Sequence, residues 1–494
     1  MLFSSYEFIF GFLPITLLAF HLARKYLDGR IALGIIVASS LFFYGWWNPL
    51  YLLLLTGSMV VNYAFARRLE KRSSAALLFT GVTINLAVLG YFKYRNFFLE
   101  NVSHFTGHNW ELEPIFVPLA ISFFTFQQIA FLVDVREGRA EVRDFVNYSA
   151  FVALFPQLIA GPIVLYREID EQFDMLRSGK GRGLALFGPG LLIFALGLFK
   201  KVALADAIAP YADTAFNLAD RLTFLEAWAG AIAYSLQLYF DFSGYADMAV
   251  GLGLMLGIIL PINFNTPFRA TSMVEFWKRW HITMTRFFMM YLYSPIALSI
   301  TRQVMERGYS GIPAFTLAIA VPIGLTFLLS GLWHGAAWTF VAFGAVNAVG
   351  LITNHAWRQA KLPPLPSLVG WLLTMTTVVI SFVYFRAESI ENAHAILLAM
   401  ATPQDIILPN WLAGFAVHFD LPWRTLDFFS TGTYTLRLIV WIGLLFIISV
   451  LPLNRTTAPN LIASSWSHAF LTAALLLISF GLLDRPQAFI YFQF

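Results

Sequence analysis

Long apolar stretches alternate with short polar and charged segments along the whole chain. These stretches approach the roughly 20 residues that an α-helix needs to cross a lipid bilayer. They lie near residues 5–22, 31–47, 49–66, 75–92, 117–135, 186–209, 226–246, 313–332, 335–353, 367–385, 435–453 and 466–483. Shorter apolar segments at 148–166, 248–260 and 287–300 are either further full spans or re-entrant segments, which hydropathy does not distinguish. The pattern predicts an all-α polytopic membrane protein with about a dozen transmembrane helices.

Composition agrees with this prediction. Hydrophobic residues make up 59% of the 494 residues and charged residues 12%, whereas soluble domains carry about 25% charged residues. The mean hydropathy is +0.69. We therefore expect one integral membrane domain over residues 1–494, with the lipid bilayer as its surroundings. The net charge of +4 does not indicate a nucleic-acid partner, because the basic residues follow the membrane topology.

The basic residues predict which side of the membrane each loop faces. The loops after the first, third and fifth spans are rich in Arg and Lys, and the positive-inside rule places such loops in the cytoplasm. The amino terminus then faces outward. The loop with Arg358 and Lys361 is cytoplasmic, the segment 387–433 lies outside, and the terminal Phe489 to Phe494 lies at the outer interface. The first span has no cationic start, so we expect a retained helix and not a cleaved signal peptide.

The absence of cysteine removes several kinds of chemistry. A disulfide, a thiolate nucleophile and a Cys-ligated metal are all impossible in this chain. The motifs G-x-S-x-G, H-E-x-x-H and the Walker phosphate loop are also missing from the sequence. We therefore expect neither a resident metal nor a bound cofactor. Gly251, Gly253 and Gly257 indicate close helix packing better than a dinucleotide site, because the spacing is wrong for the latter.

Polar residues interrupt the apolar span that contains Gln237 to Asp247. Gln237, Asp241 and Tyr245 follow one another at intervals of four and so share a helix face, while Ser243 and Asp247 form a second such pair. Carboxylates in this setting must be paired, hydrogen-bonded, protonated or in contact with water. A structural pairing with Arg or Lys elsewhere is the favoured interpretation, and a role along a substrate channel stays open.

Residues 263–286 combine aromatic, basic and amide side chains. Ser272 and Glu275 fit a helix-opening capping box, after which Trp277, Trp280 and His281 would share one helix face. Such a helix suits anchoring in lipid headgroups as well as binding an anionic donor. The donor-binding candidates are Arg269, Lys278 and Arg279, the last of which also has the right spacing to pair with Glu275.

A histidine lies between two apolar stretches in Leu332-Trp333-His334-Gly335. An ionisable side chain at that depth is costly and is a functional-site candidate by default, although it could instead hydrogen-bond neighbouring helices. Gly331 and Gly335 permit close backbone approach beside it. A further segment, Phe151 to Pro162, contains Pro156, Gly161 and Pro162 and predicts a broken helix, as a kink or as a cavity wall.

Together these segments resemble the membrane-bound O-acyltransferase family (MBOAT) and, within it, the bacterial alginate O-acetyltransferase-like branch. The resemblance covers about residues 117–350 and the carboxyl terminus. It rests on SFFTFQQIAFLVDVREG, FPQLIAGPI, LFKKVALAD, YFDFSGYADMAVGLGLMLG, LPINFNTPFRA, FWKRWHITMTRF, SGLWHGAAWTF and the terminal FIYFQF. The stretch after Arg286 reads FFMMYLYSPIALSI and departs from the resemblance, because relatives commonly have a more polar, basic segment there.

The resemblance implies a transmembrane enzyme whose helices enclose a central channel. It implies that His334 is the principal catalytic residue and His281 a second family histidine. The family's aspartate and asparagine motifs fall on Asp241, Asp247, Asn263 and Asn265. Together with Ser243, Trp280 and Trp333, these four residues are our candidates for substrate or channel contacts.

The expected function is O-acetylation in a bacterial inner membrane. A neutral His334 would act as general base on an acceptor hydroxyl, with acetyl-CoA as the cytoplasmic donor. An oxyanion donor could come from Trp280, His281 or Asn265. The resemblance implies an envelope polysaccharide as final acceptor and a separate periplasmic acyltransferase as partner. A D-alanyl transferase that uses a carrier-protein thioester, and a multi-pass transporter, are the alternatives.

Overall fold

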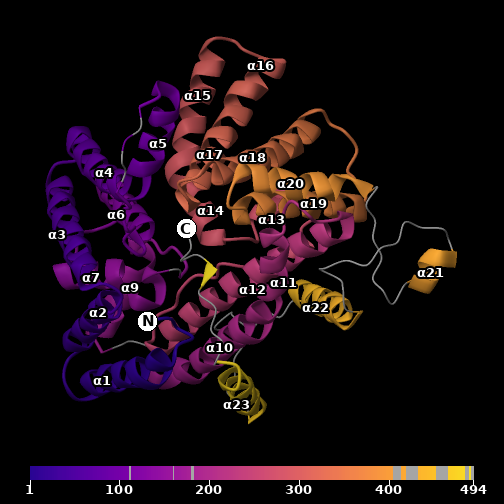
Figure 1. The fold of residues 1–494 in the computed structure, drawn as a ribbon. Helices are drawn as coiled ribbons and strands as arrows, with labels where there is room; N and C mark the ends of the chain where they lie inside the picture. The colour runs from indigo at the N-terminus through magenta and orange to yellow at the C-terminus, as the bar shows by residue number, and fades with distance from the viewer. Residues whose placement is uncertain are drawn as a thin grey trace. The chain divides into compact units, whose positions relative to one another are not determined.

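The computed structural model describes residues 1–108, 110, 113–159, 161–179, 183–403, 413–418, 432–451, 466–483 and 489–490. Within these residues every regular element is a helix (Figure 1), which confirms the all-α prediction. The predicted outer segment 387–433 falls partly outside them, and residues 491–494 of the terminal motif fall wholly outside.

Five helical stretches are long and apolar enough to cross a membrane, judged by length and composition. They are Glu7–Tyr26, Pro49–Lys71, Ala75–Thr106, Gly311–His334 and Ser367–Arg386. Each of the other predicted spans also contains a helix. The full count of a dozen crossings stays a prediction.

The chain divides into two compact units. The first comprises Met1–Phe199, Gly244–Ile262 and Thr456–Gln493, and the second comprises Lys200–Ser243, Asn263–Arg455 and Phe494. Helix α12 (Phe224–Met255) contributes residues to both. The expectation of one domain stays a prediction.

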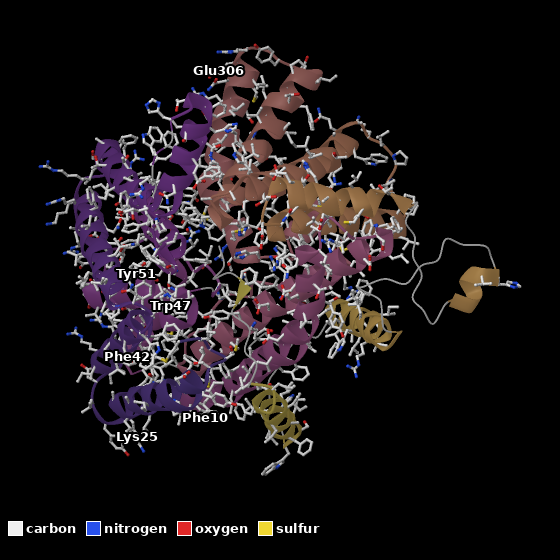
Figure 2. The ribbon with its side chains drawn as sticks, viewed as in Figure 1. Phe10, Lys25, Phe42, Trp47, Tyr51 and Glu306 are labelled. Atoms are coloured by element: carbon white, nitrogen blue, oxygen red, sulfur yellow. The ribbon has the colours of Figure 1, made fainter. Side chains whose placement is uncertain are left out.

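The first unit is built mainly from the amino-terminal helices. They are α1 (Leu13–Tyr26), α2 (Gly29–Gly45), α3 (Pro49–Lys71), α4 (Ala75–Leu89), α5 (Arg95–Thr106), α6 (Ile121–Arg136), α7 (Phe145–Ala153), α8 (Phe155–Leu158), α9 (Tyr166–Arg177) and α10 (Phe187–Phe199), with α23 (Trp466–Phe480). Large apolar side chains such as Phe10, Phe42 and Trp47 are exposed on this unit (Figure 2). Such exposure is expected where lipid, and not water, surrounds the helices.

Two local predictions for this unit are confirmed. The chain breaks between α7 and α8 and again after Leu158, where Pro156, Gly161 and Pro162 interrupt the apolar run. Small residues also allow α10 and α12 to touch, since a Cβ at Gly251 would lie 2.6 Å from the Gly190 carbonyl oxygen. Gly251 therefore serves helix packing, as its setting predicts.

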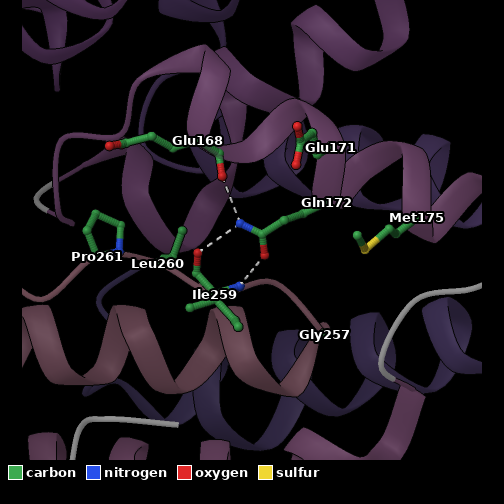
Figure 3. Close-up of a pocket in the computed structure, with 8 residues that line it drawn as sticks. All are labelled: Glu168, Glu171, Gln172, Met175, Gly257, Ile259, Leu260 and Pro261. Atoms are coloured by element: carbon green, nitrogen blue, oxygen red, sulfur yellow. Dashed lines mark hydrogen bonds between the residues drawn. The ribbon is translucent and has the colours of Figure 1, made fainter.

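Helix α9 holds the segment that follows α12 in this unit. The Gln172 side chain donates to the Ile259 carbonyl oxygen at 3.1 Å and accepts from the Ile259 N–H at 2.8 Å (Figure 3). A cavity of about 420 Å³ lies beside this contact, lined in part by Glu168 and Glu171. The contact holds the chain just after the end of α12.

The second unit carries all the predicted site residues except Asp247. Its elements are the π-helical turns η4 (Lys200–Ala205), η6 (Met289–Tyr293) and η7 (Thr316–Ala320), the short 3-10 helix η5 (Pro267–Arg269), and α11 (Asp206–Asn217), α12 as far as Ser243, α13 (Met273–Trp277), α14 (Ile282–Phe288), α15 (Ser294–Glu306), α16 (Gly311–Phe315), α17 (Val321–His334), α18 (Trp338–Gln359), α19 (Ser367–Arg386), α20 (Ile390–Ala401), α21 (Ala413–His418) and α22 (Gly432–Val450). Helices α17 and α18 form a tight hairpin joined by residues 335–337.

Glycines set the close approach within this hairpin. A Cβ at Gly331 would lie 2.1 Å from the Phe340 carbonyl oxygen, and one at Gly335 would lie 2.0 Å from the Phe340 ring. On the other helix, a Cβ added at Gly344 would lie 2.3 Å from the Phe327 carbonyl oxygen. The prediction that Gly331 and Gly335 permit close backbone contact is therefore confirmed, and His334 lies at the point where the two helices meet.

Candidate active site

His334 ends α17 and is enclosed by aromatic rings. Its side chain is buried, and its ring centroid lies 4.8 Å from that of Trp333, 5.1 Å from Phe385 and 5.6 Å from Phe343. All three contacts are edge-to-face, a geometry that holds a flat ring firmly in place. The hairpin and α19 thus fix the orientation of this imidazole.

His281 lies at a break in the helix that the sequence predicts over residues 273–286. Helix α13 ends at Trp277, α14 begins at Ile282, and His281 between them has a left-handed φ of 43°. The predicted shared face of Trp277, Trp280 and His281 is therefore wrong. The cause is a long-range pairing: the Asn265 N–H donates to the Arg279 carbonyl oxygen and the Ile282 N–H to that of Asn263, both at 2.9 Å.

Other local predictions for this segment hold. Ser272 caps α13 by accepting from the Glu275 N–H at 3.2 Å. Glu275 pairs with Arg279 at 2.8 Å, at the predicted spacing. The Glu275 carboxylate reaches back to the Thr271 N–H, one residue before the cap, so the capping box is present in a shifted form.

Asn263 fixes the tautomer of His281. The Thr283 N–H and hydroxyl both donate to one side-chain atom of Asn263, at 3.2 and 2.9 Å, which identifies that atom as the oxygen. The same oxygen lies 3.1 Å from His281 Nδ1. Because an amide oxygen can only accept, Nδ1 must carry the proton and Nε2 must carry the lone pair. The side-chain nitrogen of Asn263 is buried and, among the described residues, has no hydrogen-bond partner.

The surroundings of His281 keep it neutral. The side chain is fully buried, outside the candidate membrane-spanning helices, and this burial lowers its pKa to about 3. Phe242 contacts its ring edge-to-face at 4.7 Å, and the Trp333 ring lies 6.2 Å away between centroids. Trp333 therefore contacts both His281 and His334, and the structure brings the two candidate catalytic histidines to the same indole.

Asp241 belongs to a buried ion-pair cluster. Lys201 Nζ lies 2.8 Å from Asp241 Oδ1 and 2.7 Å from Asp206 Oδ1. Lys201 and Asp241 are both almost wholly buried. The π-helical turn η4 provides the spacing of five residues that aligns Lys201 with Asp206. This geometry supports the structural interpretation of Asp241, in which the carboxylate pairs with a basic residue elsewhere in the chain.

The other channel candidates are spread over different settings. Ser243 is buried on α12, and Trp280 is buried among Tyr239, Phe264 and Phe276. Asn265 is exposed, so its side chain is poorly placed to act in a buried centre. Asp247 lies on the part of α12 that belongs to the first unit.

The three donor-binding candidates, Arg269, Lys278 and Arg279, lie in different surroundings. The guanidinium of Arg279 is occupied by Glu275 and by the Asn265 carbonyl oxygen. Arg269 is exposed at the end of η5. Lys278 is exposed and lines a cavity of about 230 Å³ between α13, α14, α17 and α18. It is the candidate that adjoins a cavity.

Most of the residues that line this cavity are apolar, but three of them have a buried polar atom that forms no hydrogen bond among the described residues. Trp277, Thr285 and Thr326 line it, and the Nε1 atom of Trp277 and the Oγ1 atoms of both threonines are buried and, within the described part of the chain, form no hydrogen bond. Helical threonines elsewhere donate to the carbonyl four residues earlier, as Thr374 does to Gly370 at 2.7 Å. The two cavity hydroxyls therefore depart from the usual arrangement, and they can serve a ligand.

The cavity leads toward His334, a candidate catalytic histidine, along one helix face. Thr326 and Ser330 line it, and both precede His334 at intervals of four residues on α17. Residues at this spacing lie one above the other on the same side of a helix. A molecule held in the cavity would therefore extend toward the His334 imidazole.

Several site residues were not among the sequence candidates. Lys201, Thr283, Phe242 and Phe385 each contact a candidate directly. Lys201, Phe242 and Thr283 lie within motifs that carry the family resemblance, whereas Phe385 lies outside them. Phe242, Thr283 and Phe385 are ordinary residue types that become informative once the fold places them.

Comparison with known proteins decides the class of this enzyme. The family model described as "MBOAT, membrane-bound O-acyltransferase family" matches residues 83–390, which is more than half of the chain. The chain belongs to the membrane-bound O-acyltransferase family. Membership confirms the resemblance seen in the motifs, and it makes the protein a membrane-associated O-acyltransferase.

Curated relatives refine the placement within the MBOAT family. The peptidoglycan O-acetyltransferase of Helicobacter pylori is 36% identical, over 100% of this chain and 98% of the relative. The probable alginate O-acetylase AlgI of Azotobacter vinelandii is 38% identical, over 81% of this chain and 78% of the relative. The teichoic acid D-alanyltransferase of Bacillus subtilis is 25% identical, over 77% and 96% respectively.

Proposed function

We propose that this MBOAT enzyme transfers an acetyl group from acetyl-CoA in the cytoplasm, across the inner membrane, for O-acetylation of an envelope or secreted polysaccharide. A separate periplasmic acyltransferase would complete the transfer. The higher identities belong to relatives named for O-acetylation of peptidoglycan and of alginate, which favours acetyl as the group and a sugar polymer as the final acceptor.

The observation that carries the proposal is the pair of buried imidazoles on Trp333. His334 serves as general base: it takes the proton of an acceptor hydroxyl, whose oxygen attacks the thioester carbonyl carbon. A C–O bond forms, the C–S bond breaks, and the proton passes from His334 to the departing sulfur. The protein supplies a dry, rigid aromatic enclosure for this exchange.

Asn263 is the best-placed donor for the oxyanion of this reaction. Its buried amide nitrogen carries two N–H groups beside His281, while its oxygen is used to hold that ring. His281 presents a lone pair at Nε2, so in this tautomer it accepts a hydrogen bond and does not serve as an oxyanion donor through Nε2.

The cavity beside Lys278 suits the donor. A thioester arm that carries amides needs hydrogen-bonding groups within an apolar channel, and Trp277, Thr285 and Thr326 offer them. Lys278 is placed to attract the phosphates at the outer end of such an arm.

A D-alanyl transferase that uses a carrier-protein thioester is the second candidate. The Bacillus subtilis relative has that name, and its match extends over most of both chains. The two functions share the histidine chemistry and differ in the donor. Only a donor comparison separates them.

The test supplies each donor to proteoliposomes that contain the purified protein and its acceptor fraction. Radiolabelled acetyl-CoA should deliver label to the polymer, while a D-alanyl carrier protein should not. Lys278→Gln should raise the KM for acetyl-CoA several-fold and leave kcat nearly unchanged, because Lys278 contributes only to donor binding. Arg302→Gln, an exposed arginine on α15, is the matched control.

Two results would contradict the proposal. Transfer from the D-alanyl carrier with no transfer from acetyl-CoA would assign the second function. Movement of a solute across the vesicle membrane with no cleavage of thioester would indicate a transporter instead.

A further inference from the structure

A long groove runs between α18 and α19. It encloses about 850 Å³ and is lined by α18 from Ala345 to Arg358 and by α19 from Ser367 to Ile380. The start of α13 forms part of its wall, where the Met273 N–H donates to Asn354 at 2.8 Å. The helix that carries Trp277 therefore begins at this groove.

The lining changes from apolar to polar along the groove. One end is formed by Ala345, Val346 and Ile380, whereas the other end has Arg358 and Ser367. Between the two ends, Gly350 lets α18 pack closely against Met273, because a Cβ at this position would lie only 3.0 Å from the Met273 side chain. A ligand that fits must have an apolar body and a polar or charged end.

The dimensions suit an extended hydrocarbon chain. The lining of α18 extends over 13 residue steps, or about 20 Å at 1.5 Å per residue. A groove of 850 Å³ and that length has a mean cross-section of about 40 Å². An extended hydrocarbon chain is about 4–5 Å wide, so one or two such chains fit.

The polar end is suited to an anionic group. Arg358 is exposed and, among the described residues, forms no ion pair. Helix α19 starts at Ser367 after Pro366, which provides no side-chain cap, so the first N–H groups of a 20-residue helix face this end. Trp357 braces the connecting loop through an Nε1–H hydrogen bond of 2.9 Å to Pro363.

We propose that this groove binds one anionic glycerophospholipid. The phosphate lies between Arg358 and the amino terminus of α19, and an acyl chain follows the groove toward Ile380. The length of about 20 Å is about two-thirds of a roughly 30 Å hydrocarbon core, so it does not reach across the bilayer, and one lipid with its phosphate at Arg358 would enter it from the leaflet on that side. This lipid would support the start of α13, and it is distinct from the acyl donor and acceptor.

The test is photolabelling in nanodiscs that contain phosphatidylcholine with a minor share of phosphatidylglycerol. Phosphatidylglycerol with a diazirine in its acyl chain should label peptides from 345–358 and 367–380, and unlabelled phosphatidylglycerol should compete while phosphatidylcholine should not. Arg358→Gln should lower this labelling about fivefold. Val349→Trp, which fills the groove from an exposed position, should abolish it.

The matched control is Arg302→Gln, which removes another exposed arginine, from α15, and should leave the labelling unchanged. Circular dichroism melts of each variant report on folding, so that lost labelling in a folded protein counts for the proposal. Equal labelling by the two lipids, or full labelling of folded Arg358→Gln, would overturn it. So would label spread evenly over all lipid-facing helices, or a co-purifying membrane protein crosslinked into the groove.

Discussion

Asn263 performs two tasks with one side chain. Its oxygen holds His281 Nδ1 and Thr283, and its nitrogen remains available in the buried centre. Asn263→Leu removes both groups in a similar volume, so we expect acetyl transfer to fall by about 10²–10³-fold. The measurement is the initial rate of label transfer from acetyl-CoA.

The matched control is Asn265→Leu, which changes an exposed asparagine two residues away. Its transfer rate should stay within about twofold of wild type. Asn263→Asp keeps the acceptor oxygen but loses the amide N–H groups, and it should also be slow. Wild-type rates for Asn263→Leu would show that neither the tautomer nor the donor matters.

The depressed pKa of His281 predicts a pH-dependent stability. In the folded protein the ring stays neutral down to pH of about 3, whereas in the unfolded chain it takes a proton near pH 6.5. Below pH 6.5 the unfolded state therefore binds one more proton, and stability should fall by up to about 1.4 kcal/mol per pH unit. Above pH 6.5 this contribution is complete and constant.

The measurement is the thermal unfolding midpoint of wild type and His281→Gln between pH 7.5 and 5. The wild-type midpoint should fall more steeply with acidification than that of the variant, because glutamine does not titrate. The other histidines are common to both proteins and cancel in the comparison. Parallel curves would mean that His281 is already charged or accessible in the folded state.

At the scale of elements, the α17–α18 hairpin depends on Gly331. Alanine at this position would place a methyl group 2.1 Å from the Phe340 carbonyl oxygen, so the helices must separate. We expect Gly331→Ala to destabilise the protein by about 1–3 kcal/mol and to reduce transfer, since His334 sits where the helices meet. Gly324→Ala on the same helix has nothing within 4 Å of the added methyl and should gain up to about 1 kcal/mol.

The π-helical turn η4 predicts a second effect at this scale. Lys201→Met would leave Asp206 and Asp241 without their shared cation in a buried setting. Removing one partner of a buried ion pair costs about 3–5 kcal/mol. Thermal unfolding should show this loss, and Lys201→Met combined with Asp241→Asn should recover part of it. Lys25→Met, on an exposed lysine, should have little effect.

At the scale of the whole molecule, the helices could be predicted because apolar stretches of sufficient length have few alternatives in a membrane. Glycine-rich contacts and the α7–α8 break could also be predicted, because their causes are local. The break at His281 could not. It depends on backbone pairing with Asn263 and Asn265, and no glycine or proline marks it.

In the candidate site, too, local features could be predicted from the sequence and long-range contacts could not. The motifs located both histidines, but not the contacts that orient them. Lys201 meets Asp241 forty positions along the chain, and Phe385 reaches His334 from a helix beyond the motif-bearing core. Such contacts are set by tertiary packing, which the spacing of residue types within one segment does not encode.

The most direct test of this account is the rate at which membranes with His334→Ala transfer radiolabelled acetyl from acetyl-CoA. Removal of the general base should lower the rate by about 10²–10⁴-fold while the thermal unfolding midpoint stays close to that of wild type. A folded His334→Ala protein that transfers acetyl at the wild-type rate would contradict the central claim.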